Sequence, residues 1–129
     1  MGMRNIIIAL FVLFAFVYGC KREEIFSGIV NFEILNVSSG VIKEVNIQIV
    51  NHAEGINVYT FKNIELNKKE TKSINLSSFN IKGDASYKIV AILEAGKKLE
   101  RSFGYITNGV DISTNGYTIE ISNSEVSLK

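Results

Sequence analysis

The single histidine of this 129-residue chain is the first residue that could do acid–base chemistry. His52 is followed two residues later by Glu54, and a carboxylate can orient a histidine that acts as a general base near neutral pH. The sequence carries no nucleophile motif to accompany this pair, and a serine triad would need three groups that converge from distant segments. We interpret His52 as an exposed loop residue, and we expect no catalytic site and no enzyme activity.

A second candidate for chemistry is the segment 111–116, with the sequence DISTNG. It matches the opening of a calcium loop, because oxygen-bearing side chains stand at positions 1, 3 and 5 and glycine at position 6. Position 12, which needs a bidentate glutamate, is Ser122. Because Asn115-Gly116 is typical of a tight turn, we predict a turn between two strands, with a calcium site as the alternative. One His and one Cys are too few for tetrahedral zinc, so we expect no metal and no cofactor.

The charge balance bears on the class of partner. Fourteen Lys and Arg residues stand against thirteen Asp and Glu residues, which leaves a formal charge of +1. Nucleic-acid binding needs a clustered basic field, so we expect no nucleic-acid partner. Hydrophobic residues make up 47% of the chain and charged residues 21%, as is typical of a globular domain.

The N-terminal residues have the pattern of an export signal. A weakly basic start is followed by an unbroken apolar run over residues 6–17. This run is shorter than the roughly 20 residues that a membrane-spanning helix needs, and it has the length of a signal-peptide core. The run ends in Val17-Tyr18-Gly19-Cys20, which resembles the bacterial lipobox, although Tyr18 is bulkier than the usual residue at that position.

The resemblance to bacterial lipoproteins implies a lipid anchor. Signal peptidase would cut between Gly19 and Cys20, and the Cys20 sulfur would carry the lipid that holds the chain to a membrane. Two alternatives remain: an ordinary thiol behind a conventional cleavage site, and a short uncleaved anchor. Lys21 replaces the Asp that marks inner-membrane retention, and residues 21–24 (KREE) loosely resemble the acid-rich tether of surface-exported lipoproteins. We therefore predict the bacterial cell envelope, with the outer membrane or cell surface favoured over the inner membrane.

From residue 25 onward the apolar residues repeat with period two and turn residues interrupt them at short intervals. This pattern predicts an all-β domain of about 7–9 short strands, arranged as a sandwich or a small barrel. Residues 87–93 are nearly all apolar and are predicted to form a central strand that is buried on both faces. The expected organisation is a signal peptide with a hydrophobic helix at 1–19, the lipidated Cys and tether at 20–27, and the β domain at 28–129.

One stretch favours the sandwich. It resembles the E strand, the E–F corner and the F strand of immunoglobulin-like domains, through Ile74, Leu76, Phe79, Ala85, Tyr87 and Ile89. The resemblance implies an Ig-like antiparallel β-sandwich in which the Tyr87 hydroxyl bonds to upstream backbone. Gly83 stands where the usual corner Asp would be, and the chain has no Trp for strand C, so Val58, Tyr59 or Phe61 would have to fill that part of the core.

Residues 103–109 (FGYITNG) form the densest mixture of aromatic, glycine and amide groups in the domain. Such groups suit recognition when they are exposed, which makes Tyr105, Thr107 and Asn108 a possible recognition loop. The alternative is that Leu99, Phe103 and Tyr105 share one core-facing side of a strand that leads into a turn.

Three functions follow from these patterns. The first is a lipid-tethered binding or structural module of the envelope, without catalysis, whose partners are the membrane and a protein or glycan ligand. The second is a small envelope inhibitor or immunity protein that blocks a secreted enzyme such as a lysozyme or a toxin. The third, a hydrolase or carrier with a site assembled from loops, lacks any motif in its support.

Overall fold

The computed structural model describes residues 28–51 and 54–129. The predicted signal peptide, the predicted lipidation site Cys20, the predicted tether and His52 lie outside the described residues.

The described chain is built from strands, as the period-two pattern predicts. Nine strands and one 3-10 helix, η1, follow one another, and the described residues contain no α-helix. Their bounds are β1 (Ile29–Asn36), β2 (Ile42–Asn51), β3 (Glu54–Ile64), β4 (Lys69–Asn75), η1 (Leu76–Phe79), β5 (Asp84–Leu93), β6 (Lys98–Thr107), β7 (Val110–Asp111), β8 (Gly116–Ile121) and β9 (Val126–Leu128). The predicted all-β class is confirmed.

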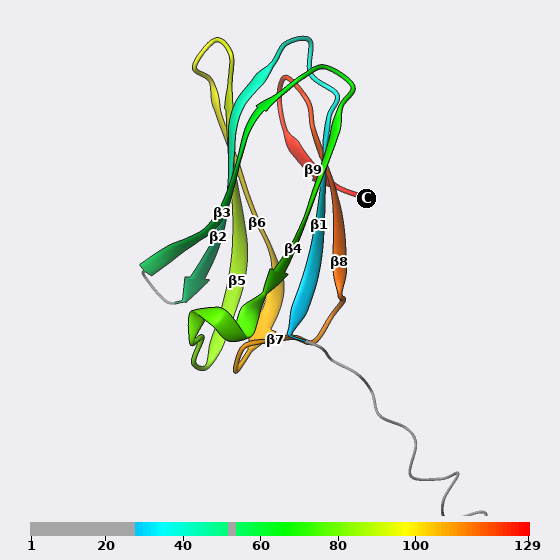
Figure 1. Cartoon of the computed structure of the whole chain (residues 1–129). Helices are drawn as coiled ribbons and strands as arrows, with labels where there is room; N and C mark the ends of the chain where they lie inside the picture. The colour runs from blue at the N-terminus through cyan, green and yellow to red at the C-terminus, as the bar shows by residue number, and fades with distance from the viewer. Residues whose placement is uncertain (1–27, 52–53) are drawn as a thin grey trace, which may run out of the picture.

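The strands form two sheets that face each other (Figure 1). One sheet has the order β4-β1-β8-β9, and the other has the order β3-β2-β5-β6-β7. Within the described residues, neighbouring strands are antiparallel except for β1 and β8, which run parallel, with Asn31 opposite Gly116 and Asn36 opposite Ile121. The last part of the chain therefore pairs directly with the first described strand.

The core lies between the two sheets and is made by alternate residues of their strands. Eight core-facing residues of β1, β2 and β8 that alternate with polar ones are at most 1% exposed: Val30, Phe32, Ile34, Val45, Ile47, Ile49, Ile119 and Ile121. Tyr117, in the same series on β8, is partly buried. Burying a side chain of this size contributes about 1.5–3 kcal/mol. Strand β5 lies between β2 and β6, and its Ile89, Val90 and Ala91 are buried, as predicted for a central strand. Phe61 is buried in the core, and Val58 and Tyr59 are partly buried and pack against the core. All three lie on the edge strand β3.

A bulge in β6 interrupts the alternation. Tyr87 pairs with Phe103 and Ala85 pairs with Ile106, so one more residue lies between the partners on β6 than on β5. Gly104 occupies the bulge with a φ of 74°. Phe103 and Ile106 both reach the core, whereas Tyr105 is 43% exposed. The expectation that Tyr105 shares the core-facing side of Phe103 is therefore wrong, because the bulge reverses the alternation after Gly104.

Gly104 is also the point where two tyrosines approach the backbone most closely. A Cβ at this position would lie 2.6 Å from Tyr87 Cδ2 and 2.7 Å from the Tyr117 hydroxyl. We expect Gly104→Ala to lower the free energy of unfolding by roughly 2–4 kcal/mol, through overpacking and a positive φ. Gly83 has a similar φ of 69° with nothing within 4 Å of its Cβ position, so Gly83→Ala should lose only about 1–2 kcal/mol. Urea unfolding followed by circular dichroism measures both, and equal losses would contradict the packing argument.

Candidate functional site

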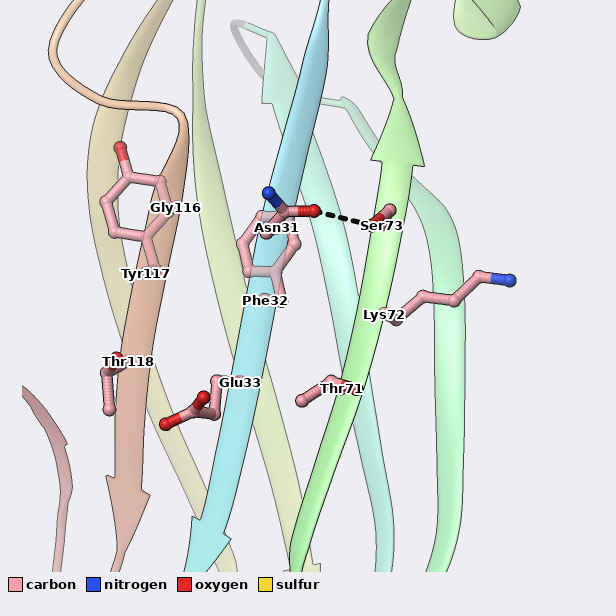
Figure 2. Close-up of a pocket in the computed structure, with 9 residues that line it drawn as sticks. All are labelled: Asn31, Phe32, Glu33, Thr71, Lys72, Ser73, Gly116, Tyr117 and Thr118. Carbon is pink, nitrogen blue, oxygen red and sulfur yellow. Dashed lines mark hydrogen bonds between the residues drawn. The ribbon is translucent and has the colours of Figure 1, made fainter.

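The outer face of the four-stranded sheet carries an open hollow of about 520 Å³ over β4, β1 and β8 (Figure 2). The side chains that point outward around it are small and polar. They are Asn31 and Glu33 of β1, Thr71 and Ser73 of β4, and Thr118 of β8, beside Gly116, which has no side chain. We refer to this surface as the sheet hollow. It is the main candidate binding site that the structure adds to those expected from the sequence.

Strand pairing explains how these residues come together. Asn31 lies opposite Ser73 on one side and Gly116 on the other, and Glu33 lies between Thr71 and Thr118 in the same way. Two rows of outward residues therefore cross the sheet, and the row that contains Gly116 leaves space above the backbone.

The other three lining residues contribute mainly backbone to the sheet hollow. Phe32, Lys72 and Tyr117 alternate with the outward residues, so their side chains point to the opposite side of the sheet. The Lys72 side chain runs away from the hollow (Figure 2), and its Nζ lies 4.8 Å from the centroid of the Tyr59 ring. This lysine therefore adds a cation–π contact between the edges of the two sheets rather than a charge inside the hollow.

The polar groups of the sheet hollow keep hydrogen-bonding capacity. Asn31 Oδ1 accepts a hydrogen bond from the Ser73 hydroxyl. Within the described residues, neither Asn31 Nδ2 nor the hydroxyl of Thr71 or Thr118 has a protein partner. Glu33 Oε1 lies 3.2 Å from Lys69 Nζ, so its charge is balanced. The hollow thus presents donors and acceptors with little net charge.

In the predicted recognition loop the Tyr105 side chain is exposed, whereas Thr107 and Asn108 form hydrogen bonds at the end of the β5–β6 pair. The Thr107 hydroxyl donates to Asp84 Oδ1 at 3.0 Å. Asn108, with a φ of 47°, exchanges two hydrogen bonds with Gly83, one through its side-chain oxygen at 3.1 Å and one through its N–H at 2.9 Å. Tyr105 is exposed, and the neighbouring Asp84 raises the pKa of its hydroxyl. Binding by these three residues stays a prediction.

The DISTNG segment leads from β7 in one sheet to β8 in the other, so it connects two strands as predicted. The expected tight turn at Asn115-Gly116 is wrong, because neither residue has a positive φ and Gly116 already begins β8. Asp111 is 2% exposed. Its Oδ1 accepts from the Ser113 N–H at 2.9 Å, the Ser113 hydroxyl at 2.7 Å and the Thr114 N–H at 3.2 Å. Its Oδ2 accepts from the hydroxyls of Tyr117 at 2.7 Å and Tyr87 at 3.0 Å. Both carboxylate oxygens are therefore engaged by protein groups.

Tyr87 differs from the immunoglobulin-like expectation. Its hydroxyl was expected to bond to backbone upstream, but it donates to the carboxylate of Asp111, which lies downstream in the sequence. The pairing of β6 with both β5 and β7 brings this carboxylate to the Tyr87 ring, and an ionised acceptor forms a stronger hydrogen bond than a neutral carbonyl.

The pKa values in this cluster reflect burial and mutual hydrogen bonding. Burial acts to raise the pKa of Asp111, but the hydrogen bonds from Tyr117, Ser113 and Tyr87 outweigh it and lower the pKa below its ordinary value. Burial, together with the neighbouring Asp111, raises the pKa of Tyr117 to about 12 and that of Tyr87 well above its ordinary value. The cluster is therefore one buried carboxylate stabilised by two neutral phenols.

Sequence reasoning did not identify the sheet hollow. The polar residues of β1, β4 and β8 served only to mark the strand period, and which strands become neighbours cannot be read from that period. Among the described residues, no group of three or more His, Cys, Asp or Glu side chains is placed to hold a metal ion. In the same part of the chain, no helix has the length and apolar character to cross a membrane.

Comparison with known proteins gives one structural similarity. No protein-family model matches the chain, and no curated protein matches it. Among solved structures, the chain is similar to the NMR structure of a protein from Eubacterium rectale, with a TM-score of 0.49 and 13% sequence identity over 82% of this chain and 91% of that one.

The buried Asp111 carboxylate should contribute more to the free energy of unfolding than an exposed carboxylate does. We expect Asp111→Asn to lower the free energy of unfolding by roughly 2–4 kcal/mol at neutral pH, because the amide turns a donor toward hydroxyls that need an acceptor. Asp84→Asn is the matched control, since Asp84 is exposed and accepts from Thr107, and it should cost less than about 1 kcal/mol. Chemical denaturation of both variants tests this, and similar losses would speak against a special role for Asp111.

The same cluster predicts how stability depends on pH. The Asp111 pKa is lower in the folded chain, so its contribution is complete above the unfolded value of about 3.9 and is lost as the pH falls through the folded value. The Tyr117 pKa is raised to about 12, so its contribution is complete below about pH 10 and is lost as the pH rises toward 12. Denaturation curves across pH should show a weaker acid dependence in Asp111→Asn and a weaker alkaline dependence in Tyr117→Phe. Unchanged slopes in these variants would refute the assignment.

Proposed function

We propose that this chain is a bacterial lipoprotein whose β domain is a non-catalytic binding module, held to a membrane of the cell envelope by lipid on Cys20. The observation that carries the proposal is the apolar run 6–17 followed by Val17-Tyr18-Gly19-Cys20, with the only cysteine of the chain at the position where a lipobox requires it. Thiol chemistry supports the assignment, because cysteine sulfur is the nucleophile that a thioether-linked lipid needs. Lys21 and the charged residues after it favour the outer membrane or the cell surface.

The position of Gly28 supports a defined orientation for such a module. The Gly28 carbonyl accepts from the Leu76 N–H at 2.7 Å, at the end of the domain where β1 begins and β7 lies (Figure 1). The eight peptide steps from Cys20 to Gly28 span at most about 28 Å. A lipid on Cys20 would hold this end close to the bilayer, and the β1–β2, β3–β4, β5–β6 and β8–β9 connections at the opposite end (Figure 1) would point away from it.

We further infer that the module is Ig-like. The order β3-β2-β5-β6 corresponds to strands C′, C, F and G of a variable-type sheet, and β1 lies beside β4 as strand B lies beside strand E. The segment from β4 through η1 to β5 crosses from one sheet to the other as an E–F corner does. Two features depart from that pattern: β8 lies parallel to β1, and Tyr87 bonds to Asp111.

The lipid anchor is tested by replacing the cysteine. We expect the wild-type chain to be cleaved before Cys20 and to carry acyl chains, and we expect Cys20→Ala to lose the acyl mass and stable membrane attachment. Gly19→Ala keeps a small residue at the cleavage site and is the matched control, which should remain lipidated. Membrane fractionation and intact mass spectrometry provide the measurement.

Each alternative predicts a different mass. A chain that begins at residue 20 without acyl groups would indicate a conventional cleavage site. A full-length chain that stays in the membrane would indicate an uncleaved anchor. Membrane attachment of Cys20→Ala with the mobility of the wild type would overturn the lipoprotein proposal.

A further inference from the structure

The sheet hollow has the chemistry of a small polar binding site. We propose that it binds an uncharged sugar unit of a glycan, with Asn31 as the central donor and Glu33 as the central acceptor. The proposal rests on the proposed function, because an envelope lipoprotein meets glycans at the membrane that holds it. It adds to that function the class of ligand and the place where the ligand binds.

The free hydrogen-bonding groups match the hydroxyls of a sugar. Asn31 Nδ2 has two N–H donors, and within the described part of the chain the protein uses neither of them. Glu33 keeps one carboxylate oxygen free of its ion pair with Lys69. The hydroxyls of Thr71 and Thr118 flank it on the two neighbouring strands (Figure 2). Since a sugar hydroxyl both donates and accepts, adjacent hydroxyls can bond to an amide, a carboxylate and a neighbouring hydroxyl at the same time.

The charges around the hollow favour an uncharged ligand. Glu33 is paired with Lys69 at 3.2 Å, and Glu120, one row further along β8, is paired with Lys129 at 3.3 Å. Each carboxylate therefore has its own cation, and no excess of either sign remains to attract a phosphate, a sulfate or an amine.

The absence of exposed apolar side chains in the hollow argues against a protein partner. Protein interfaces have an apolar core, but none of the large hydrophobic side chains that are exposed on the described domain lines the sheet hollow: these are Ile29, Val37, Ile56, Leu66, Tyr105 and Ile112.

The site is preorganised by its place in the sheet. Strand β1 is hydrogen-bonded on both sides, to β4 and to β8, so Asn31 and Glu33 stand on a rigid backbone. A preorganised site loses less conformational entropy when the ligand binds. Gly116 completes it, because its missing side chain leaves the space beside Asn31; a Cβ there would lie 3.5 Å from the Asn31 carbonyl oxygen.

The test is an NMR titration of the full ¹⁵N-labelled chain in a polyoxyethylene detergent, which has no sugar headgroup to compete. The probes are neutral disaccharides of glucose, galactose, mannose and N-acetylglucosamine, with glucuronic acid as the charged comparison, each up to about 20 mM to reach millimolar affinities. We expect saturable shifts at the Asn31 side-chain amide and the Thr71, Gly116 and Thr118 amides with at least one neutral sugar. The charged sugar should bind more weakly.

Two variants and one control locate the binding. Asn31→Ala removes the central donor, and Gly116→Thr fills the space beside it; each should weaken binding about tenfold or more. Asn57→Ala is the control, because Asn57 is also exposed and also bonds to a hydroxyl, that of Thr60 at 3.0 Å, but lies on the other sheet. It should bind as the wild type does. Thermal unfolding of each variant shows whether the fold is kept.

Several outcomes would overturn the proposal. No saturable shift with any neutral sugar, shifts that both hollow variants leave unchanged, or a preference for glucuronic acid would each do so. Shifts at the hollow that depend on protein concentration without sugar would identify it as a contact between copies of the chain instead. The intact mass of the wild-type chain reports the lipid separately from the titration. Sugar binding by a wild-type chain that carries no lipid would refute the anchor alone, and a lipidated chain without sugar binding would refute the glycan site alone. Cys20→Ala should bind the same sugars as the wild type, because the sheet hollow does not include Cys20.

Discussion

The buried carboxylate of Asp111 is the interaction on which the arrangement of the two sheets depends. It accepts from Tyr87 of the five-stranded sheet and from Tyr117 of the four-stranded sheet, so a single side chain joins both layers. The rings of these tyrosines pack with Phe32 and Phe103 at centroid distances between 4.9 and 5.7 Å. A buried charge is tolerated only when its hydrogen bonds are satisfied, and here five donors satisfy it.

The aromatic rings that pack around Asp111 and the sheet hollow lie on opposite faces of the same segments of β1 and β8. Phe32 and Tyr117 face the core, and their sequence neighbours Asn31 and Gly116 face outward beside each other. The contact between the two inward rings helps to hold β1 and β8 together, and the outward row depends on that pairing. A change that displaced Tyr117 from Asp111 would therefore also alter the position of Asn31 on the opposite face of the sheet. This would happen although Tyr117 and Asn31 have no side-chain contact.

Local sequence patterns predicted the strands well, because burial on one face imposes a period of two. Val45, Ile47 and Ile49 illustrate this, because all three are buried. The period-two pattern wrongly predicted that Tyr105 faces the core. The bulge at Gly104 shifts the alternation by one residue, and no spacing in the sequence predicts the bulge. The pattern also could not predict that Tyr87 would find Asp111, or that Asn31 would lie beside Gly116. The contact of Tyr87 with Asp111 depends on the pairing of β6 with both β5 and β7, and that of Asn31 with Gly116 depends on the parallel pairing of β1 with β8. Each pairing joins residues too far apart in sequence for any local signal.

That parallel pairing has a consequence for the order of folding. Strand β1 takes its two partners from β4 and from β8, and six other strands, β2 to β7, lie between β1 and β8 in the sequence. Closing such a long loop costs entropy before any contact offsets it, so we expect β1 and β8 to pair after the antiparallel strands that are close together in sequence. The four-stranded sheet is then the last part of the domain to close, and Asn31 and Gly116 come together only at that stage.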